Sequence, residues 1–113
     1  LGSAKSGTKH AWHTYVTAVA LLPLTIAFVW IVLTLVGKDY NTVRATLGAP
    51  LPAIIMLLFL LTSVYHMKLG MQTIIEDYVH GAHAKTYSLL GNLFFCCAVG
   101  LACVYAILRI SFV

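Results

Sequence analysis

Long apolar runs, separated by short polar segments, dominate the pattern of hydrophobic and polar positions along the chain. A helix needs about 20 predominantly apolar residues to cross the hydrocarbon core of a bilayer. Three runs reach that length, at residues 15–36, 51–76 and 87–108. The pattern therefore predicts an all-α membrane protein, with three transmembrane helices in a single membrane-anchor domain over residues 1–113.

The segments outside these runs carry the helix breakers and most of the charges. Residues 1–9 are rich in Gly, Ser and Lys, which predicts a solvated tail. Residues 37–50 combine charged residues with Gly and Pro and predict a loop, and residues 76–85 predict a second polar connection. Within the first run, Pro23 predicts a kink, because neighbouring helices or Thr hydroxyls can satisfy the carbonyl that it frees.

Composition supports a membrane location and excludes one class of function. Hydrophobic residues make up 61% of the chain and charged residues 9%, whereas a soluble domain carries about 25% charged residues. The net charge is +4, but the basic residues are scattered, which excludes nucleic-acid binding through one basic face. With three spans, the basic residues also divide equally between the two sides of the membrane, so their distribution does not predict which side the N-terminus faces. Cys96, Cys97 and Cys103 lack a metal-site spacing and are interpreted as small core hydrophobes.

Two ionisable residues lie inside the second run, His66 and Lys68. A charged residue at the centre of a span costs about 2.5 to 3.5 kcal/mol, so each of the two is a functional hypothesis. A neutral histidine on a helix offers a ring nitrogen to a haem iron, and the alternative is a hydrogen bond to another helix. Lys68 is interpreted either as the partner of a haem propionate or as a side chain that extends to water or to a subunit interface.

A stripe on the same predicted helix links His66 to the membrane boundary. Gly70 lies one turn beyond His66, where the missing side chain lets a flat macrocycle or a neighbouring backbone approach. Asp77 falls on nearly the same face as His66, about 16 Å from His66 along the helix axis. Glu76 and Asp77 either handle protons or form a solvated helix end, and the phenol of Tyr78 can donate a hydrogen bond to a carbonyl.

The second run ends in a stretch that resembles the haem-ligand and quinone-site motif of the small membrane-anchor subunit of succinate dehydrogenase (complex II): HMKLGMQTIIEDYVHG, residues 66–81. The likeness lies in a histidine, a glycine four residues later, and Asp-Tyr eleven and twelve residues later. The order of segments agrees over nearly the whole chain, and residues 9–22 resemble the start of the family's first span. Family members often carry an arginine just before Thr17, and here Tyr15 and Val16 stand in that neighbourhood.

The resemblance implies a fold and a set of roles. The chain would be half of a two-subunit anchor bundle, in which His66 is one axial ligand of haem b and the larger cytochrome b anchor subunit supplies the other. Tyr78 would donate a hydrogen bond to a ubiquinone carbonyl, and Asp77 would organise that site and its proton supply. The iron-sulfur subunit would complete the quinone pocket.

The implied enzyme is a succinate dehydrogenase (quinone) of the tricarboxylic acid cycle and respiratory chain. Succinate oxidation would belong to the flavoprotein and iron-sulfur subunits, because this chain has no dinucleotide fingerprint and no Cys-rich cluster motif. This subunit would help to pass electrons from the iron-sulfur subunit to ubiquinone. His10, His13 and Lys68 are the candidates for the cation near the haem propionates or the quinone. A bacterial inner membrane and a mitochondrial inner membrane both fit this role.

Two alternatives remain open from the sequence. The chain is also compatible with the anchor of a fumarate reductase, because the direction of the reaction between succinate and fumarate depends on the quinone and on the partner subunits. A non-enzymatic helper or transporter subunit would use Asp77 and the histidines as a proton path, and it would bind no haem. His80 and His83 have a spacing compatible with metal binding, but two histidines are a weak signal for a metal site.

Overall fold

The fold is an all-α arrangement with three membrane-length helices. The computed structural model describes residues 2–113, and it describes side chains from Gly7 onward. The helices are α1 (Gly2–Leu35), α2 (Tyr40–Gly48), α3 (Pro50–Tyr78) and α4 (Ala82–Phe112). Those long and apolar enough to cross a membrane cover Gly7–Leu35, Pro50–Tyr78 and Ala82–Phe112. The prediction of an all-α protein with three transmembrane helices is confirmed.

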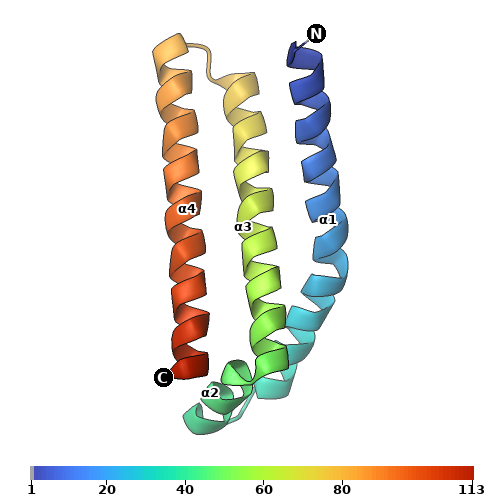
Figure 1. Cartoon of the computed structure of the whole chain (residues 1–113), viewed down its shortest axis with the longest axis vertical. Helices are drawn as coiled ribbons and strands as arrows, with labels where there is room; N and C mark the ends of the chain where they lie inside the picture. Colours follow the sequence, from blue (N-terminus) through green and yellow to red (C-terminus); the bar gives the residue numbers. More distant parts are fainter. Residues whose placement is uncertain (1) are drawn as a thin grey trace.

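The three long helices lie in one row, with α3 in the middle (Figure 1). One side of α3 packs on α1, where the rings of Phe28 and Phe59 stack with their centroids 4.4 Å apart. The opposite side packs on α4, where the side-chain amide of Asn92 donates a hydrogen bond to the backbone carbonyl of Lys68 at 3.0 Å. Because α1 and α4 pack on opposite sides of α3, the three helices form an open layer rather than a closed bundle.

Burial is sparse throughout this layer. The buried hydrophobic side chains among the described residues are Ile31, Ala53, Leu69, Ile75, Cys96 and Ile107. Such a layer would be unstable in water, whereas in a bilayer the apolar tails of lipids solvate exposed Leu and Ile side chains. The open faces therefore require lipid or another membrane subunit against them.

Helix α1 is longer than the first apolar run. Its described part begins at Gly2, so residues 2–9 are helical, and residues 7–9 are exposed, while Leu1 lies outside the described residues. A helix already formed in the membrane extends readily into water, because each added residue gains one hydrogen bond without a new nucleation step. The helix bends where the colour bar places residue 20 and those just after it (Figure 1), and Pro23 lies inside it. The predicted kink is confirmed.

The prediction of a loop over residues 37–50 was wrong, because this segment contains the short helix α2. Gly37 ends the turn after α1 with a positive φ of 80°, a conformation that glycine adopts without strain. Asp39 then caps α2 by accepting a hydrogen bond from the backbone N–H of Thr42 at 3.3 Å. Hydrogen bonding by the Thr42 side chain lowers the pKa of the Asp39 carboxyl, so the charged cap persists at neutral pH and is lost only as the pH falls through that lowered pKa.

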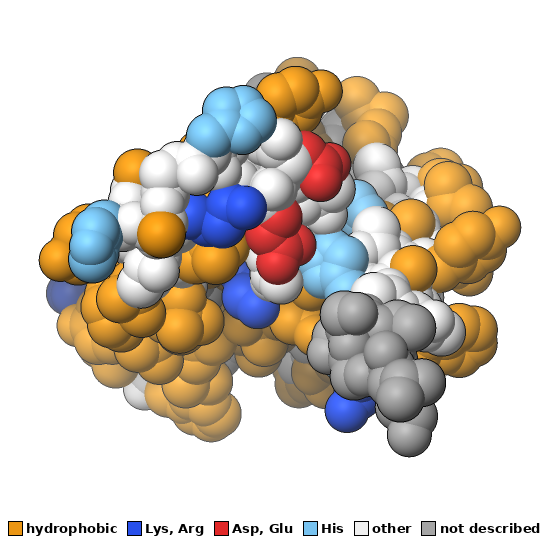
Figure 2. Space-filling model, turned by 90° about the horizontal axis from the view of Figure 1, so that it is seen from above, with side chains coloured by type: hydrophobic (Ala, Val, Ile, Leu, Met, Phe, Trp, Pro, Cys, Tyr) orange, Lys and Arg blue, Asp and Glu red, His pale blue; other side chains and the backbone are white. Residues whose placement is uncertain are grey.

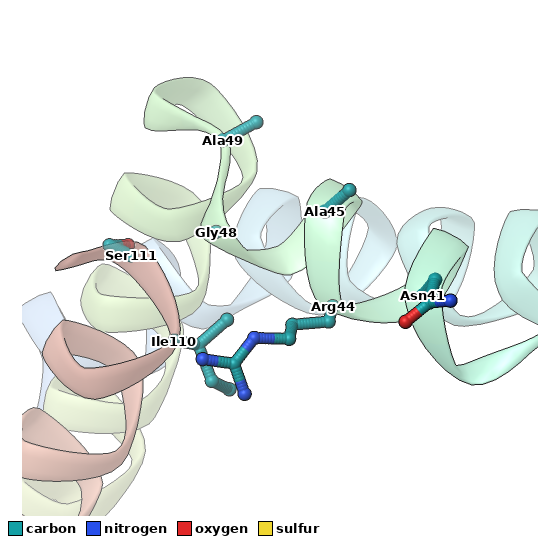
Figure 3. A pocket seen from close by; sticks show the side chains of 7 residues that line it. All are labelled: Asn41, Arg44, Ala45, Gly48, Ala49, Ile110 and Ser111. Atoms are coloured by element: carbon teal, nitrogen blue, oxygen red, sulfur yellow. The ribbon is translucent and has the colours of Figure 1, made fainter. Parts of the chain in front are cut away.

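Helix α2 docks against the C-terminal end of α4. Figure 3 shows Arg44 extending from α2 toward Ile110, with Gly48 at the end of α2 nearby. A Cβ atom at Gly48 would lie 2.8 Å from the backbone oxygen of Ile110, closer than real Cβ contacts allow. The absence of a side chain at Gly48 therefore sets how closely α2 approaches α4.

We expect Gly48→Ala to destabilise the docking of α2 by about 1 to 3 kcal/mol, the usual cost of overpacking, because the backbone of α4 has to move. Amide hydrogen exchange of α2 in the assembled complex measures this directly. Gly91→Ala is the matched control, since a Cβ there meets nothing within 4 Å of the chain. Equal exchange rates in the two variants would contradict the close approach.

Candidate functional site

Polar side chains join α1 to α3 in the half of the layer that contains the N-terminus of α1. The hydroxyl oxygen of Thr17 lies 2.8 Å from Nδ1 of His66. We refer to the contacting residues as the α1–α3 seam: His10, His13, Thr17, Tyr65, His66 and Thr73. Polar side chains within the hydrocarbon region need hydrogen-bond partners in the protein. The three contacts of the seam supply such partners between α1 and α3, away from lipid.

The other two contacts of the seam involve the histidines of α1. His10 Nε2 lies 2.8 Å from the hydroxyl of Thr73, about two helical turns closer to the membrane boundary than the Thr17–His66 contact. His13 Nδ1 lies 2.7 Å from the phenol oxygen of Tyr65, and the two rings are tilted with centroids 6.0 Å apart. Both histidines of the sequence analysis therefore lie on the side of α3 that carries His66.

The surface next to His66 is open. Gly70 follows one turn later on the same face of α3, and a Cβ placed there would meet nothing within 4 Å. His66 itself is half-buried, and its ring contacts α1 through Nδ1 and Thr17. The strip beside His66 and Gly70 has the shape expected where a flat group or another helix packs against α3.

Asp77 and Tyr78 lie at the end of α3, at the boundary predicted from the sequence. The helix continues through both residues, and the backbone N–H of Val79 still donates to the carbonyl of Ile75 at 3.0 Å. Tyr78 is 75% exposed and Asp77 is also exposed. Seen end-on, acidic, histidine and lysine side chains gather on this end of the molecule (Figure 2). Protons and an amphipathic ligand can both reach such a surface.

Lys68 lies on the opposite side of α3 from His66. Two residues along a helix correspond to a rotation of about 200°. The ammonium group of Lys68 donates to the side-chain oxygen of Gln72 at 3.1 Å, and its backbone carbonyl accepts from Asn92 of α4. In this chain, Lys68 therefore belongs to the α3–α4 side of the layer.

The remaining candidate groups form no metal centre of their own. Within the part of the chain that the structure describes, no three His, Cys, Asp or Glu side chains gather closely enough to hold a metal ion. Cys96 is buried as predicted, but Cys97 is exposed and Cys103 is half-buried. The prediction that all three are core residues was wrong, because the open layer of helices buries few side chains among the described residues.

Sequence reasoning missed Thr17, Tyr65 and Thr73 as members of the site. A signal for two of them was present, because His10 and Thr17 are seven residues apart on α1, and His66 and Thr73 are seven apart on α3. A spacing of seven returns to nearly the same helix face, so two antiparallel helices can make both contacts at once. Reading that signal requires knowing that α1 and α3 are neighbours.

Comparison with known proteins identifies the family. Residues 1–105 match the family described as succinate dehydrogenase/fumarate reductase transmembrane subunit. The chain belongs to this family. The matched span includes the whole α1–α3 seam together with Asp77 and Tyr78. The chain is therefore an integral membrane protein and a membrane anchor of the succinate dehydrogenase family.

Curated relatives agree with this assignment. The chain is 37% identical over 111 residues to the succinate dehydrogenase hydrophobic membrane anchor subunit of Paracoccus denitrificans, covering 98% of this chain and 85% of that protein. It is 37% identical over 78 residues to the corresponding subunit of Rickettsia bellii, covering 69% and 62% of the two chains. The subunit of Rickettsia conorii is 30% identical over 107 residues, or 94% and 85%. No solved structure gave a significant match.

Proposed function

We propose that this chain is the small membrane anchor of a succinate:ubiquinone oxidoreductase. In this role His66 would hold the iron of haem b, and Tyr78 and Asp77 would form part of the ubiquinone reduction site. The observation that carries the proposal is the setting of His66: its Nδ1 is held by Thr17 of α1, and the adjoining strip at Gly70 is open. The family match supports the same role.

The residues present fit one half of a haem site. A ligating histidine generally uses one ring nitrogen for the metal and the other for a hydrogen bond that orients the ring. His66 has Nδ1 engaged with Thr17, which leaves Nε2 for the iron. Within the described part of the chain no three His, Cys, Asp or Glu side chains form a metal site, and in this proposal the larger cytochrome b anchor would supply the second ligand. Haem b bound there would supply a one-electron redox centre close to the quinone.

Tyr78 and Asp77 suit a quinone because of where they lie. The phenol of Tyr78 is an exposed hydrogen-bond donor at the membrane boundary, and it would donate to a ubiquinone carbonyl and orient the ring. Reduction of ubiquinone to ubiquinol takes up two electrons and two protons. The carboxyl of Asp77, in the same helical turn, would relay protons from the aqueous phase to the quinone oxygens.

The partner subunits follow from what this chain lacks. The flavoprotein would oxidise succinate, and the iron-sulfur subunit would deliver the electrons and complete the quinone pocket. Helix α3 packs on α1 and α4, but Gly70 is open, and the face with His66 and Gly70 is the one that the larger anchor would cover. We propose that this pairing makes the chain half of a two-subunit bundle.

His10 and His13 are our candidates for the cation near the haem propionates or the quinone. Both contact α3 on the His66 side, His10 at Thr73 and His13 at Tyr65. A protonated imidazole at either position would attract the carboxylate of a propionate. Lys68 remains the third candidate from the sequence, and its position toward α4 argues for a packing role instead.

We expect Lys68→Met to leave haem content and haem midpoint potential unchanged. The reason is that the ammonium group bonds Gln72 on the side of α3 turned away from His66. Redox titration of the purified complex, followed by absorbance, measures both quantities. A shifted potential in a fully assembled Lys68→Met complex would support the propionate role over the packing role.

The test of the proposed function is a reduced-minus-oxidised absorption spectrum of the detergent-purified complex that contains this chain. A b-type haem spectrum, together with succinate-driven quinone reduction that quinone analogues inhibit, would support the proposal. Fumarate reduction by quinol as the faster direction would favour the fumarate reductase anchor, which the family description also covers. A complex without haem and without sensitivity to quinone analogues would leave the helper or transporter alternative.

A further inference from the structure

The hydroxyl of Thr17 lies within hydrogen-bond distance of three acceptor-capable atoms. Its oxygen is 2.9 Å from the carbonyl oxygen of His13, 3.0 Å from that of Thr14, and 2.8 Å from Nδ1 of His66. A threonine has one hydroxyl hydrogen, and carbonyl oxygens can only accept. The two carbonyls belong to the preceding turn of α1, where a helical threonine commonly directs its hydrogen.

This hydrogen-bond geometry determines which ring nitrogen of His66 carries the proton. If the hydroxyl hydrogen pointed at His66, the carbonyl oxygens of His13 and Thr14 would both lie at hydrogen-bond distance from the Thr17 oxygen with no hydrogen between them. Such contacts between oxygen lone pairs are unfavourable. With the hydrogen on the carbonyl side, the Thr17 oxygen accepts, and the proton of the 2.8 Å contact comes from Nδ1–H of His66. The neutral ring then has its lone pair on Nε2.

Burial strengthens this assignment. Thr17 is 7% exposed, and among the residues whose side chains the structure describes it is the one polar residue that is buried as a whole. Water does not compete for its hydroxyl there, and a buried polar group strongly favours the arrangement that satisfies both its donor and its acceptor. Thr17 also lies within the membrane-length part of α1, Gly7–Leu35, rather than at its end.

We infer that Thr17 is the positioning residue for His66: by accepting a hydrogen bond from Nδ1–H, it fixes the ring orientation and presents the Nε2 lone pair to a haem iron. The inference rests on the proposed function, because it concerns the haem ligand. A hydrogen bond from the outer nitrogen makes a histidine a stronger donor to its metal, and outer partners of this kind change metal affinity by about 10 to 100-fold when removed.

The experiment compares Thr17→Val and Thr17→Ser in the purified complex. Valine keeps the shape of threonine but cannot accept a hydrogen bond, whereas serine keeps the hydroxyl. We expect Thr17→Val to lose haem about 10 to 100-fold faster to an external haem acceptor and to show a more positive midpoint potential, because the ligand donates less charge to iron. Thr17→Ser should behave like the wild type.

Thr14→Val is the matched control. The hydroxyl of Thr14 also bonds a carbonyl of the preceding turn, that of His10, at 3.0 Å, but it has no contact with His66. If the two threonines only stabilise α1, both valine variants should change haem retention and midpoint potential alike. If Thr17 positions His66, only Thr17→Val should change them. If Thr17→Val fails to assemble, Thr17→Ala removes the same acceptor without adding a methyl group where the hydroxyl was.

The outcomes separate the two proposals. A wild-type complex without haem overturns the proposed function and this inference with it. A wild-type complex with haem, whose potential and haem retention are unchanged in Thr17→Val or Thr17→Ala, overturns the inference and leaves the proposed function standing. A change in midpoint potential and haem retention in Thr17→Val that Thr17→Ser does not show establishes the role of the hydroxyl.

Discussion

His66→Leu is expected to remove or strongly alter the b-type haem spectrum of the complex. Leucine fills a similar space but has no nitrogen for the iron. Loss of only an outer partner of a metal ligand costs about 10 to 100-fold in affinity, so loss of the ligand itself should cost at least as much. The measurement is haem per assembled complex, together with the reduced-minus-oxidised spectrum.

The control for this variant is His83→Leu. His83 is an exposed histidine near the start of α4, stacked with Tyr87, and it lies outside the α1–α3 seam. It should leave the spectrum unchanged. A wild-type haem spectrum that survives unaltered in His66→Leu would show that His66 has a packing role, and the ligand would then have to be sought among other residues. The quinone part of the proposal would be unaffected.

Asp77→Asn and Tyr78→Phe are expected to slow quinone reduction while leaving succinate oxidation intact. Asparagine cannot relay a proton, and proton transfer by a positioned group contributes about 10² to 10⁴-fold to a rate. Phenylalanine loses one hydrogen bond to the quinone, worth about 0.5 to 1.5 kcal/mol, or roughly two- to tenfold in apparent quinone affinity. The larger effect should therefore follow Asp77→Asn and appear in kcat.

Two activities of the same preparation distinguish this result from misassembly. Succinate-driven reduction of a soluble dye reports on the flavoprotein and iron-sulfur subunits, and it should match the wild type. Tyr87→Phe is the matched control for the tyrosine, because Tyr87 is 70% exposed on α4, close to the 75% of Tyr78 on α3. Equal quinone kinetics in Tyr78→Phe, Tyr87→Phe and wild type would contradict the proposed role of Tyr78.

The number and type of membrane helices could be predicted from the sequence alone. In a bilayer the solvent is itself apolar, so a sufficiently long apolar run forms a helix whether or not another element packs on it. The stripe from His66 through Gly70 to Asp77 was likewise visible, because the helical repeat is a local property. The Asp39 cap before α2 was a local signal too, but the charges and breakers around it favoured a loop.

Which residues face one another across helices was decided only by the tertiary structure. The sequence left His66 as either a ligand or a partner in an interhelical hydrogen bond, and the structure shows that its Nδ1 makes such a bond with Thr17 of α1. It also assigned Lys68 to the α4 side and His10 and His13 to the α1–α3 seam. Helical periodicity relates residues on one helix, whereas the register between antiparallel helices depends on the packing of α1 and α4 on opposite sides of α3.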